Sequence, residues 1–164
     1  MEQRDEHSPT LRALVVGYGN PLRGDDALGF RVDDLLAAIP EIAADPLVRI
    51  ETVHQLTPEL AESISEAGLV LFVDAAAPTA ERPAGTLHCE EVHAESSSQE
   101  ALGHHLTPSQ VLAYATALHG VKPKAYLASV AAESFDYGAP LSPCVKAALP
   151  ALIRWIRNRI EEAG

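Results

Sequence analysis

Short apolar segments that alternate with helical patterns are the feature that most constrains the fold of this chain. The first, residues 11–16, is rich in leucine and valine and ends at Gly17, which is typical of a strand buried on both faces of a sheet. A weaker segment, residues 86–92, alternates apolar and polar residues and indicates an edge strand. The other predicted strands cover residues 47–53, 69–73 and 124–130. This order predicts a single three-layer α/β domain, with a largely parallel sheet between two layers of helices.

Helices are expected between these strands. Apolar residues at helical spacing run from Leu28 to Ile39, mark a second helix from Leu60 to Ala67, and form one stripe from Leu149 to Ile160. Three predicted helices begin with the same motif, in which a residue with a capping hydroxyl precedes a proline at the first helical position. The pairs are Thr57-Pro58, Thr107-Pro108, which Gln110 extends to a capping box, and Ser142-Pro143.

Composition excludes several classes of function. The chain has 164 residues, 47% of them apolar, which suits one domain with its own core. Asp and Glu number 23 against 12 Lys and Arg, so the formal net charge is −11. Neither a nucleic acid nor an anionic membrane surface attracts such a chain. An enzyme or binding protein that handles cations, metals or a basic partner is compatible with it.

The cysteines and the first residues indicate the compartment. Cys89 and Cys144 lie far apart and are expected to be reduced thiols. Residues 1–10 lack the apolar stretch of a signal peptide and are expected to form a flexible tail, with the domain over residues 11–164. The longest apolar stretch is interrupted by Asp74, so no membrane span is expected. The predicted location is the cytoplasm.

The loop after the first strand is rich in glycine, yet it does not suit a nucleotide. It reads GYGNPLRGDD over residues 17–26. The third glycine of a G-x-G-x-x-G fingerprint would fall at Leu22. Asp25 and Asp26 would also repel a phosphate at the start of the following helix. No nucleotide cofactor is expected.

The same loop suits a cation. Asp26 follows the first strand and Asp74 closes the third, so both carboxylates are expected at the carboxyl edge of the sheet, where open α/β folds bind ligands. His104 and His105 precede the helix that begins after Thr107, and one of them is placed to close over this edge. Two carboxylates and one imidazole suit a divalent ion such as Ni²⁺ or Zn²⁺.

Each of these residues has a structural alternative. Asp25 or Asp26 at a helix start stabilises the helix dipole, and Asp74 at a strand end caps a turn. Adjacent histidines in a loop are often simply solvated. Their common placement at one edge of the sheet is what favours a metal site.

Four motifs in order resemble those of the hydrogenase maturation endopeptidases, which remove a C-terminal extension from the large-subunit precursor of nickel-iron hydrogenases. The resemblance covers about residues 12–155. The motifs are Gly17-x-Gly19-Asn20-x-x-x-x-Asp25-Asp26-x-x-Gly29, Val73-Asp74-Ala75, His104-x-Leu106, and Glu133-Ser134 followed by Gly138, Leu141, Ser142 and Pro143.

The resemblance implies a twisted five-stranded sheet with one antiparallel strand, here residues 86–92. It places the catalytic, metal-binding residues at Asp26, Asp74 and His104. His104 is preferred to His105 because the family's histidine lies two residues before a leucine. Many members have Glu at the position of Asp26, so this ligand is one methylene shorter. Substrate contacts are expected from Gly19, Asn20, Asp25, His54, His105 and Glu133, although His54 also suits a plain turn.

The implied function is proteolysis directed by a metal. The nickel is implied to arrive in the precursor, which is the protein partner, and zinc or cadmium is expected to replace it in vitro. The sequence has no Ser-His-Asp order and no His-Glu-x-x-His motif, which leaves a metal-polarised carbonyl or a metal-bound water as the chemical routes. The alternative is a non-enzymatic nickel-binding accessory protein that uses the same ligands.

Overall fold

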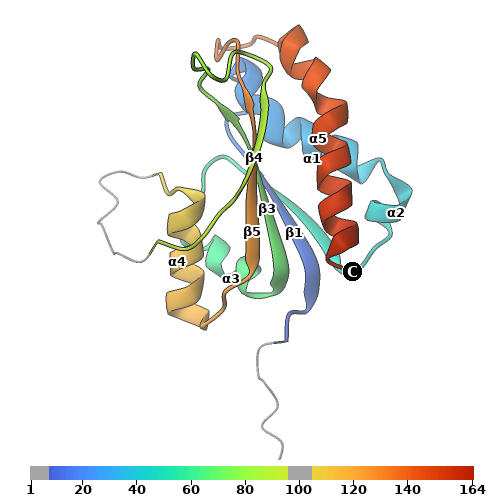
Figure 1. Cartoon of the computed structure of the whole chain (residues 1–164), viewed down its shortest axis with the longest axis vertical. Coiled ribbons are helices and arrows are strands. Elements are labelled where there is room, and N and C mark those ends of the chain that lie inside the picture. The colour runs from blue at the N-terminus through green and yellow to red at the C-terminus, as the bar shows by residue number, and fades with distance from the viewer. Residues whose placement is uncertain (1–7, 96–104) are drawn as a thin grey trace, which may run out of the picture.

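The computed structural model describes residues 8–95 and 105–164, and it has a five-stranded sheet between helices (Figure 1). The strand order is β2-β1-β3-β5-β4, and β4 alone runs antiparallel to its neighbour. The strands are β1 (Leu11–Tyr18), β2 (Val48–Val53), β3 (Ala67–Ala76), β4 (Leu87–Glu91) and β5 (Lys124–Ala131). The helices are η1 (Gly24–Ala27), α1 (Leu28–Ala37), α2 (Pro40–Ala43), α3 (Leu60–Ser65), α4 (Pro108–His119) and α5 (Pro143–Glu162). The predicted fold class and the antiparallel edge strand are confirmed.

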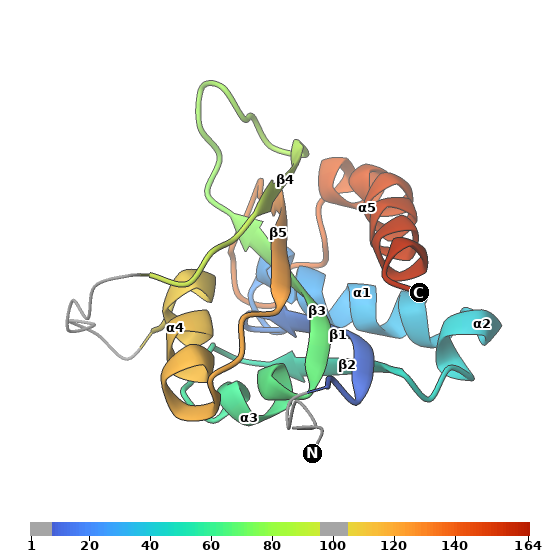
Figure 2. The ribbon, with the colours of Figure 1, turned by 60° about the horizontal axis from the view of Figure 1, so that its bottom comes forward.

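The core lies in two layers, one on each face of the sheet. Helices α1, α2 and α5 cover one face and α3 and α4 the other, as Figure 2 shows. Side chains alternate between the faces along each strand. On β3, Val73 and Ala75 belong to the first layer, whereas Val70 and Phe72 belong to the second. By the same alternation Asp74 faces the α3–α4 side, where Tyr18 of β1 also packs.

Several element boundaries differ from the sequence prediction, three of them at the ends of helices. Ile39 is not part of α1, because Pro40 begins a separate short helix and holds the preceding residue in an extended conformation. Helix α3 begins at Leu60 rather than at Pro58, and Glu59 occupies its N-cap position. Ala67 belongs to β3, so α3 is shorter than its apolar spacing predicted.

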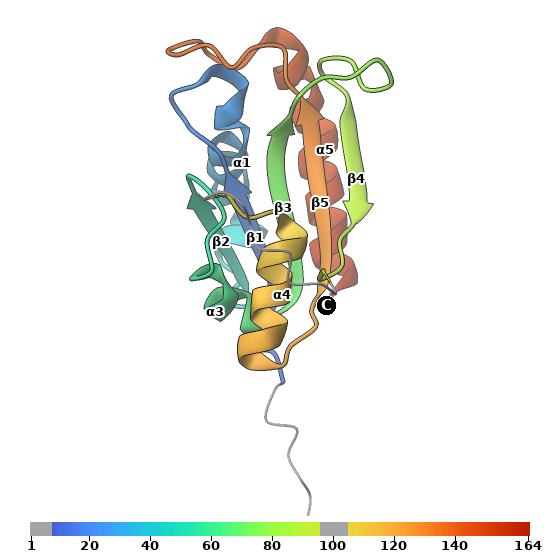
Figure 3. The ribbon, with the colours of Figure 1, turned by 90° about the vertical axis from the view of Figure 1, so that its left-hand side faces the viewer.

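Asp74 lies inside a strand rather than at its end. Strand β3 continues to Ala76 because Ala75 and Ala76 pair with Val130 and Ala131 of β5. The turn-capping alternative for Asp74 is therefore wrong. Asp74 is still near the carboxyl edge of the sheet, two residues before the end of β3, the strand that Figure 3 shows between β1 and β5.

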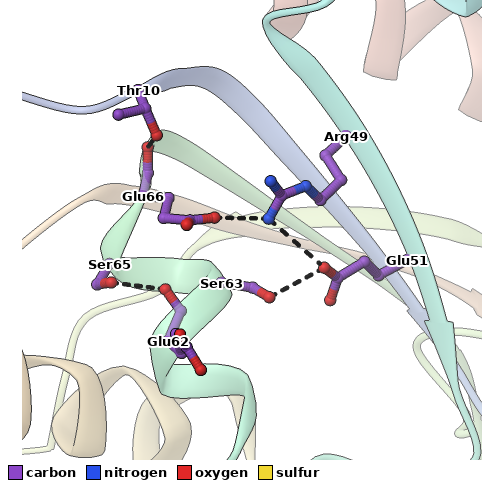
Figure 4. Close-up of polar contacts among 7 residues, drawn as sticks. All are labelled: Thr10, Arg49, Glu51, Glu62, Ser63, Ser65 and Glu66. Atoms are coloured by element: carbon purple, nitrogen blue, oxygen red, sulfur yellow. Dashed lines mark hydrogen bonds and ion pairs between the residues drawn. The ribbon is translucent and has the colours of Figure 1, made fainter.

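Polar contacts tie β2 to α3 and to Glu66, the residue between α3 and β3 (Figure 4). Arg49 donates to Glu66 at 2.6 Å and lies 3.9 Å from Glu51, which accepts a hydrogen bond from Ser63 at 2.9 Å. Exposed ion pairs of this kind contribute about 0–1 kcal/mol each. This network supports the register of β2 and offers no site. Among the described residues, no helix has the length and hydropathy needed to cross a membrane.

Candidate functional site

Glycines allow the loop after β1 to fold back against its own helix. A Cβ atom on Gly17 would lie 2.6 Å from the carbonyl oxygen of Gly29, and one on Gly29 would lie 2.7 Å from the backbone nitrogen of Tyr18. The end of β1 and the first turn of α1 therefore touch backbone to backbone. Gly19 has a φ of 144°, and a Cβ there would lie 2.2 Å from the carbonyl oxygen of Asp26. The loop can approach the start of α1 this closely because its residues at these positions have no side chain.

Asp26 is held in place by the loop that precedes it. The backbone N–H of Asn20 donates to Oδ2 of Asp26 at 2.7 Å, and the Asn20 side chain accepts from the backbone N–H of Leu22 at 2.9 Å. Asp26 is half-buried on η1, which packs against β3. One oxygen of its carboxylate is thus committed to the loop.

Asp74 is the titratable group most altered by this fold. Burial raises its pKa, hydrogen bonding by the Tyr18 hydroxyl lowers it, and the charge of Asp26 raises it again, so that the pKa of Asp74 is about 7. Burial and the Asp74 charge likewise raise the pKa of Tyr18. Because the charge of Asp26 acts on Asp74, the two carboxylates form one electrostatic unit at the edge of the sheet. A cation between them would relieve their repulsion.

Asp25 has a different role from the one predicted. Its side chain is fully buried and accepts four hydrogen bonds, from the backbone N–H groups of Glu133, Ser134 and Ser142 and from the Ser142 hydroxyl. Burial alone would raise its pKa, but the hydrogen bonds from Ser142, Glu133 and Ser134 outweigh it and lower the pKa of Asp25. A carboxylate with no exposed surface does not touch a substrate. Asp25 instead joins η1 to the loop after β5.

The remaining predicted contacts lie around this edge. His54 is exposed after β2, and its ring meets Phe30 of α1 edge-on with 5.8 Å between ring centroids. The Glu133 side chain is exposed and lies 3.7 Å from the Cys144 sulfur. His105 is exposed ahead of α4. His104 lies outside the described residues.

Two residues of this region were missed by sequence reasoning. Tyr18 ends β1 and its hydroxyl partners Asp74. Ser142 was expected to cap α5, but its hydroxyl donates to Asp25 and makes no cap hydrogen bond. Nothing in the local sequence distinguishes Ser142 from a capping serine. Tyr18, by contrast, lies between Gly17 and Gly19, and a tyrosine in such a tight loop could have been predicted to face the site.

The donor set fits a divalent cation in part. Asp26 and Asp74 offer carboxylate oxygens, and burial together with the charge of Asp26 raises the pKa of Asp74, which a nearby cation would lower. No group of three or more His, Cys, Asp or Glu side chains that would hold a metal occurs among residues 8–95 and 105–164. The third predicted ligand, His104, is outside those ranges.

Solved structures similar to this one include hydrogenase maturation proteases. The maturating endopeptidase HybD from E. coli matches with a TM-score of 0.75 and 24% identity over 94% of each chain. The nickel-iron hydrogenase maturation protease HycI from Thermococcus kodakarensis matches with a TM-score of 0.70 and 23% identity over 93% of each chain. A hydrogenase 2 maturation peptidase from a Thaumarchaeota archaeon covers 90% of this chain, with a TM-score of 0.65 and 23% identity.

These matches define the fold of the chain. It is the open α/β fold of the hydrogenase maturation proteases, which confirms at the level of structure the resemblance seen in the motifs. Neither a family model nor a curated protein matches the sequence.

Proposed function

We propose that this chain is an endopeptidase that removes the C-terminal extension of a nickel-iron hydrogenase large-subunit precursor after nickel insertion. The observation that supports the proposal is the electrostatic effect of Asp26 on Asp74, near the carboxyl edge of a sheet whose fold is that of maturation proteases. The cytoplasm remains the predicted place of action.

The two carboxylates would recognise nickel that is part of the substrate. The Asn20 N–H donates to one oxygen of Asp26, and hydrogen bonding by Tyr18 lowers the pKa of Asp74, so each acid has a neighbour that favours its charged form. His104 is the proposed third ligand, and zinc or cadmium would replace nickel in vitro. A divalent metal next to a peptide carbonyl polarises it toward attack by water. Gly19, Asn20, His54, His105 and Glu133 are the proposed contacts of the peptide.

Cleavage of a nickel-loaded precursor tests the proposal directly. The chain is incubated with the loaded and the nickel-free precursor, and the products are weighed by mass spectrometry. We expect the loaded precursor alone to lose its C-terminal peptide. A precursor that keeps its full mass with every hydrogenase type of the host would contradict the proposal.

Charge-removing variants test the site. Asp26→Asn keeps an oxygen for the Asn20 hydrogen bond but removes the charge, and Asp74→Asn removes the second charge; both should remain folded and fail to cleave. Asp34→Asn, on the exposed side of α1, is the matched control and should cleave normally. Calorimetric titration with free nickel separates this function from that of a nickel carrier. A carrier would bind free nickel tightly and leave the precursor uncut.

A further inference from the structure

A row of polar side chains crosses the sheet beside Asp74. Ser129 of β5 is in register with Asp74 of β3 on one side and with His88 of β4 on the other. Residues in register across neighbouring strands point to the same face, so all three side chains lie on the α3–α4 face. At a strand spacing of about 4.8 Å, His88 lies roughly 10 Å from Asp74 along this row.

A pocket of about 290 Å³ opens at the outer end of the row. His88 and Ser129 line it together with Ala76, which lies two residues beyond Asp74 on the same face of β3. Two residues that line the pocket, Ala76 and Ser129, are thus neighbours of Asp74 on the same face of the sheet. The loop that joins β3 to β4 projects beyond the carboxyl end of β3 (Figure 1), and its residues Thr79 and Arg82 form another wall.

Ser129 and His88 are the pocket residues that belong to the row beside Asp74, and the β3–β4 loop adds the charged side chains of Glu81 and Arg82. Ser129 is buried, 8% exposed, and Nε2 of His88 is buried with no hydrogen-bond partner among the described residues, its nearest acid being Glu90 at 3.5 Å. The Thr86 hydroxyl donates to the Pro83 carbonyl, and the Thr79 oxygen accepts from the Arg82 backbone. Buried polar groups in folded proteins normally have partners, so Nε2 of His88 is suited to receive one from a ligand.

We propose that this pocket is a subsite for one neutral hydrogen-bonding side chain of the peptide substrate, held by Ser129 and His88. The chemistry is that of a hydroxyl, amide or imidazole, because serine and imidazole each offer a donor and an acceptor. Glu81 and Arg82 both line the pocket, and their opposite charges favour neither an acid nor a base. The proposal rests on the proposed function, in which the bond is cut beside Asp26 and Asp74.

The distance fixes which substrate residue is held. An extended peptide advances about 3.3 Å per residue, so a pocket that begins one strand away from Asp74 and ends roughly 10 Å away takes a side chain within about three residues of the cut. The subsite thus recognises a side chain next to the cleaved bond, whereas the two carboxylates recognise the metal.

Paired changes in the chain and the substrate test the subsite. Six precursors each carry alanine at one of the three positions on either side of the cut, and kcat/KM is measured for the unmodified chain, Ser129→Ala and His88→Leu. His93→Leu, at an exposed histidine just beyond β4, is the matched control. At one position we expect alanine to lower kcat/KM about tenfold with the unmodified chain, the effect of about 1.4 kcal/mol. With Ser129→Ala or His88→Leu the same substitution should cause little further loss, while His93→Leu keeps the full effect.

The subsite would be overturned if, at all six positions, the loss of kcat/KM from the alanine in the precursor simply added to the loss from Ser129→Ala or His88→Leu. That result would leave the proposed function intact. If no precursor is cleaved by any form, the proposed function fails and the subsite is judged by binding. For that, the ¹⁵N-labelled chain is titrated with a peptide spanning the cut. Signals of Ser129 and His88 should shift with the parent peptide and not with the alanine version. Unchanged signals at both residues with the parent peptide would overturn the subsite independently.

Discussion

Ser142 binds Asp25 with both its backbone and its side chain. The N–H of Ser142 donates to Oδ1 at 2.7 Å and its hydroxyl donates to Oδ2 at 2.8 Å, across 117 residues of sequence. Together with Glu133 and Ser134 this joins the start of α5 and the loop after β5 to η1. Asp26, the next residue of η1, is therefore positioned by the hydrogen bonds of its neighbour.

Replacing Asp25 should destabilise the fold far more than replacing Asp26. Asp25→Ala leaves three backbone N–H groups without their acceptor, a loss of about 3 kcal/mol or more. In a domain of this size that lowers Tm by roughly 6–12 °C. Asp26→Asn keeps the acceptor for Asn20 and should shift Tm by about 2 °C or less. Thermal unfolding followed by circular dichroism measures both, and equal shifts would contradict the separate roles.

The effect of Asp25 should also depend on pH in the direction its lowered pKa dictates. A carboxylate with a pKa lowered by folding contributes stability above its unfolded pKa, and this is lost as the pH falls through the folded value. The unfolded reference is 3.8. The difference in unfolding free energy between the unmodified chain and Asp25→Ala should therefore be largest near neutral pH and narrow below pH 4. Chemical denaturation at several pH values measures it, and a constant difference would assign the effect to packing.

Asp74 should show the opposite pH dependence. Its folded pKa of about 7 lies above the reference of 3.8, so the folded chain holds a proton that the unfolded chain has released. Stability from this group is complete below the reference value and is lost as the pH rises through about 7. Asp74→Asn should therefore unfold at a higher denaturant concentration than the unmodified chain at pH 8. The two should converge near pH 4; a variant less stable at pH 8 would contradict the raised pKa.

Tyr18 should control the charge of Asp74. Hydrogen bonding by the Tyr18 hydroxyl lowers the pKa of Asp74 against the effects of burial and of Asp26. Tyr18→Phe removes that hydroxyl and keeps the ring packed against the α3–α4 layer, so the pKa of Asp74 should rise above 7. Carbon-detected NMR titration of the Asp74 carboxyl measures this directly. An unchanged midpoint would show that the tyrosine only fills space.

Much of this fold could be predicted from the sequence because burial in a parallel sheet leaves a plain pattern. The apolar segments that became β1, β3 and β5 lie on strands covered on both faces, and the weaker alternation of β4 marks an edge. The length of β3 was underestimated because Ala75 and Ala76 are held by pairing with β5, a contact that no local pattern encodes.

The candidate site was predicted less completely for the same reason. Adjacent acids look alike in sequence, yet Asp25 is buried by partners more than a hundred positions away, while Asp26 remains at the edge. Asp26 and Asp74 could be predicted to lie at one edge because parallel strands all end at the same edge of a sheet. The role of His104 stays a prediction.

Thr107 and Ser142 share the same hydroxyl-proline pattern, and a pair of double-mutant cycles should show that they act differently. Thr107 forms the capping box with Gln110, so Thr107→Ala should lower the unfolding free energy by about 1 kcal/mol. Ser142→Ala removes a hydrogen bond to a buried carboxylate, worth about 1.5–3 kcal/mol. In an Asp25→Ala background the Ser142→Ala loss should nearly vanish, because its acceptor is gone, while the Thr107→Ala loss should persist in full. Denaturant unfolding of the five variants and the unmodified chain measures both cycles. An undiminished Ser142→Ala loss without Asp25 would mean that the hydroxyl acts on α5 alone.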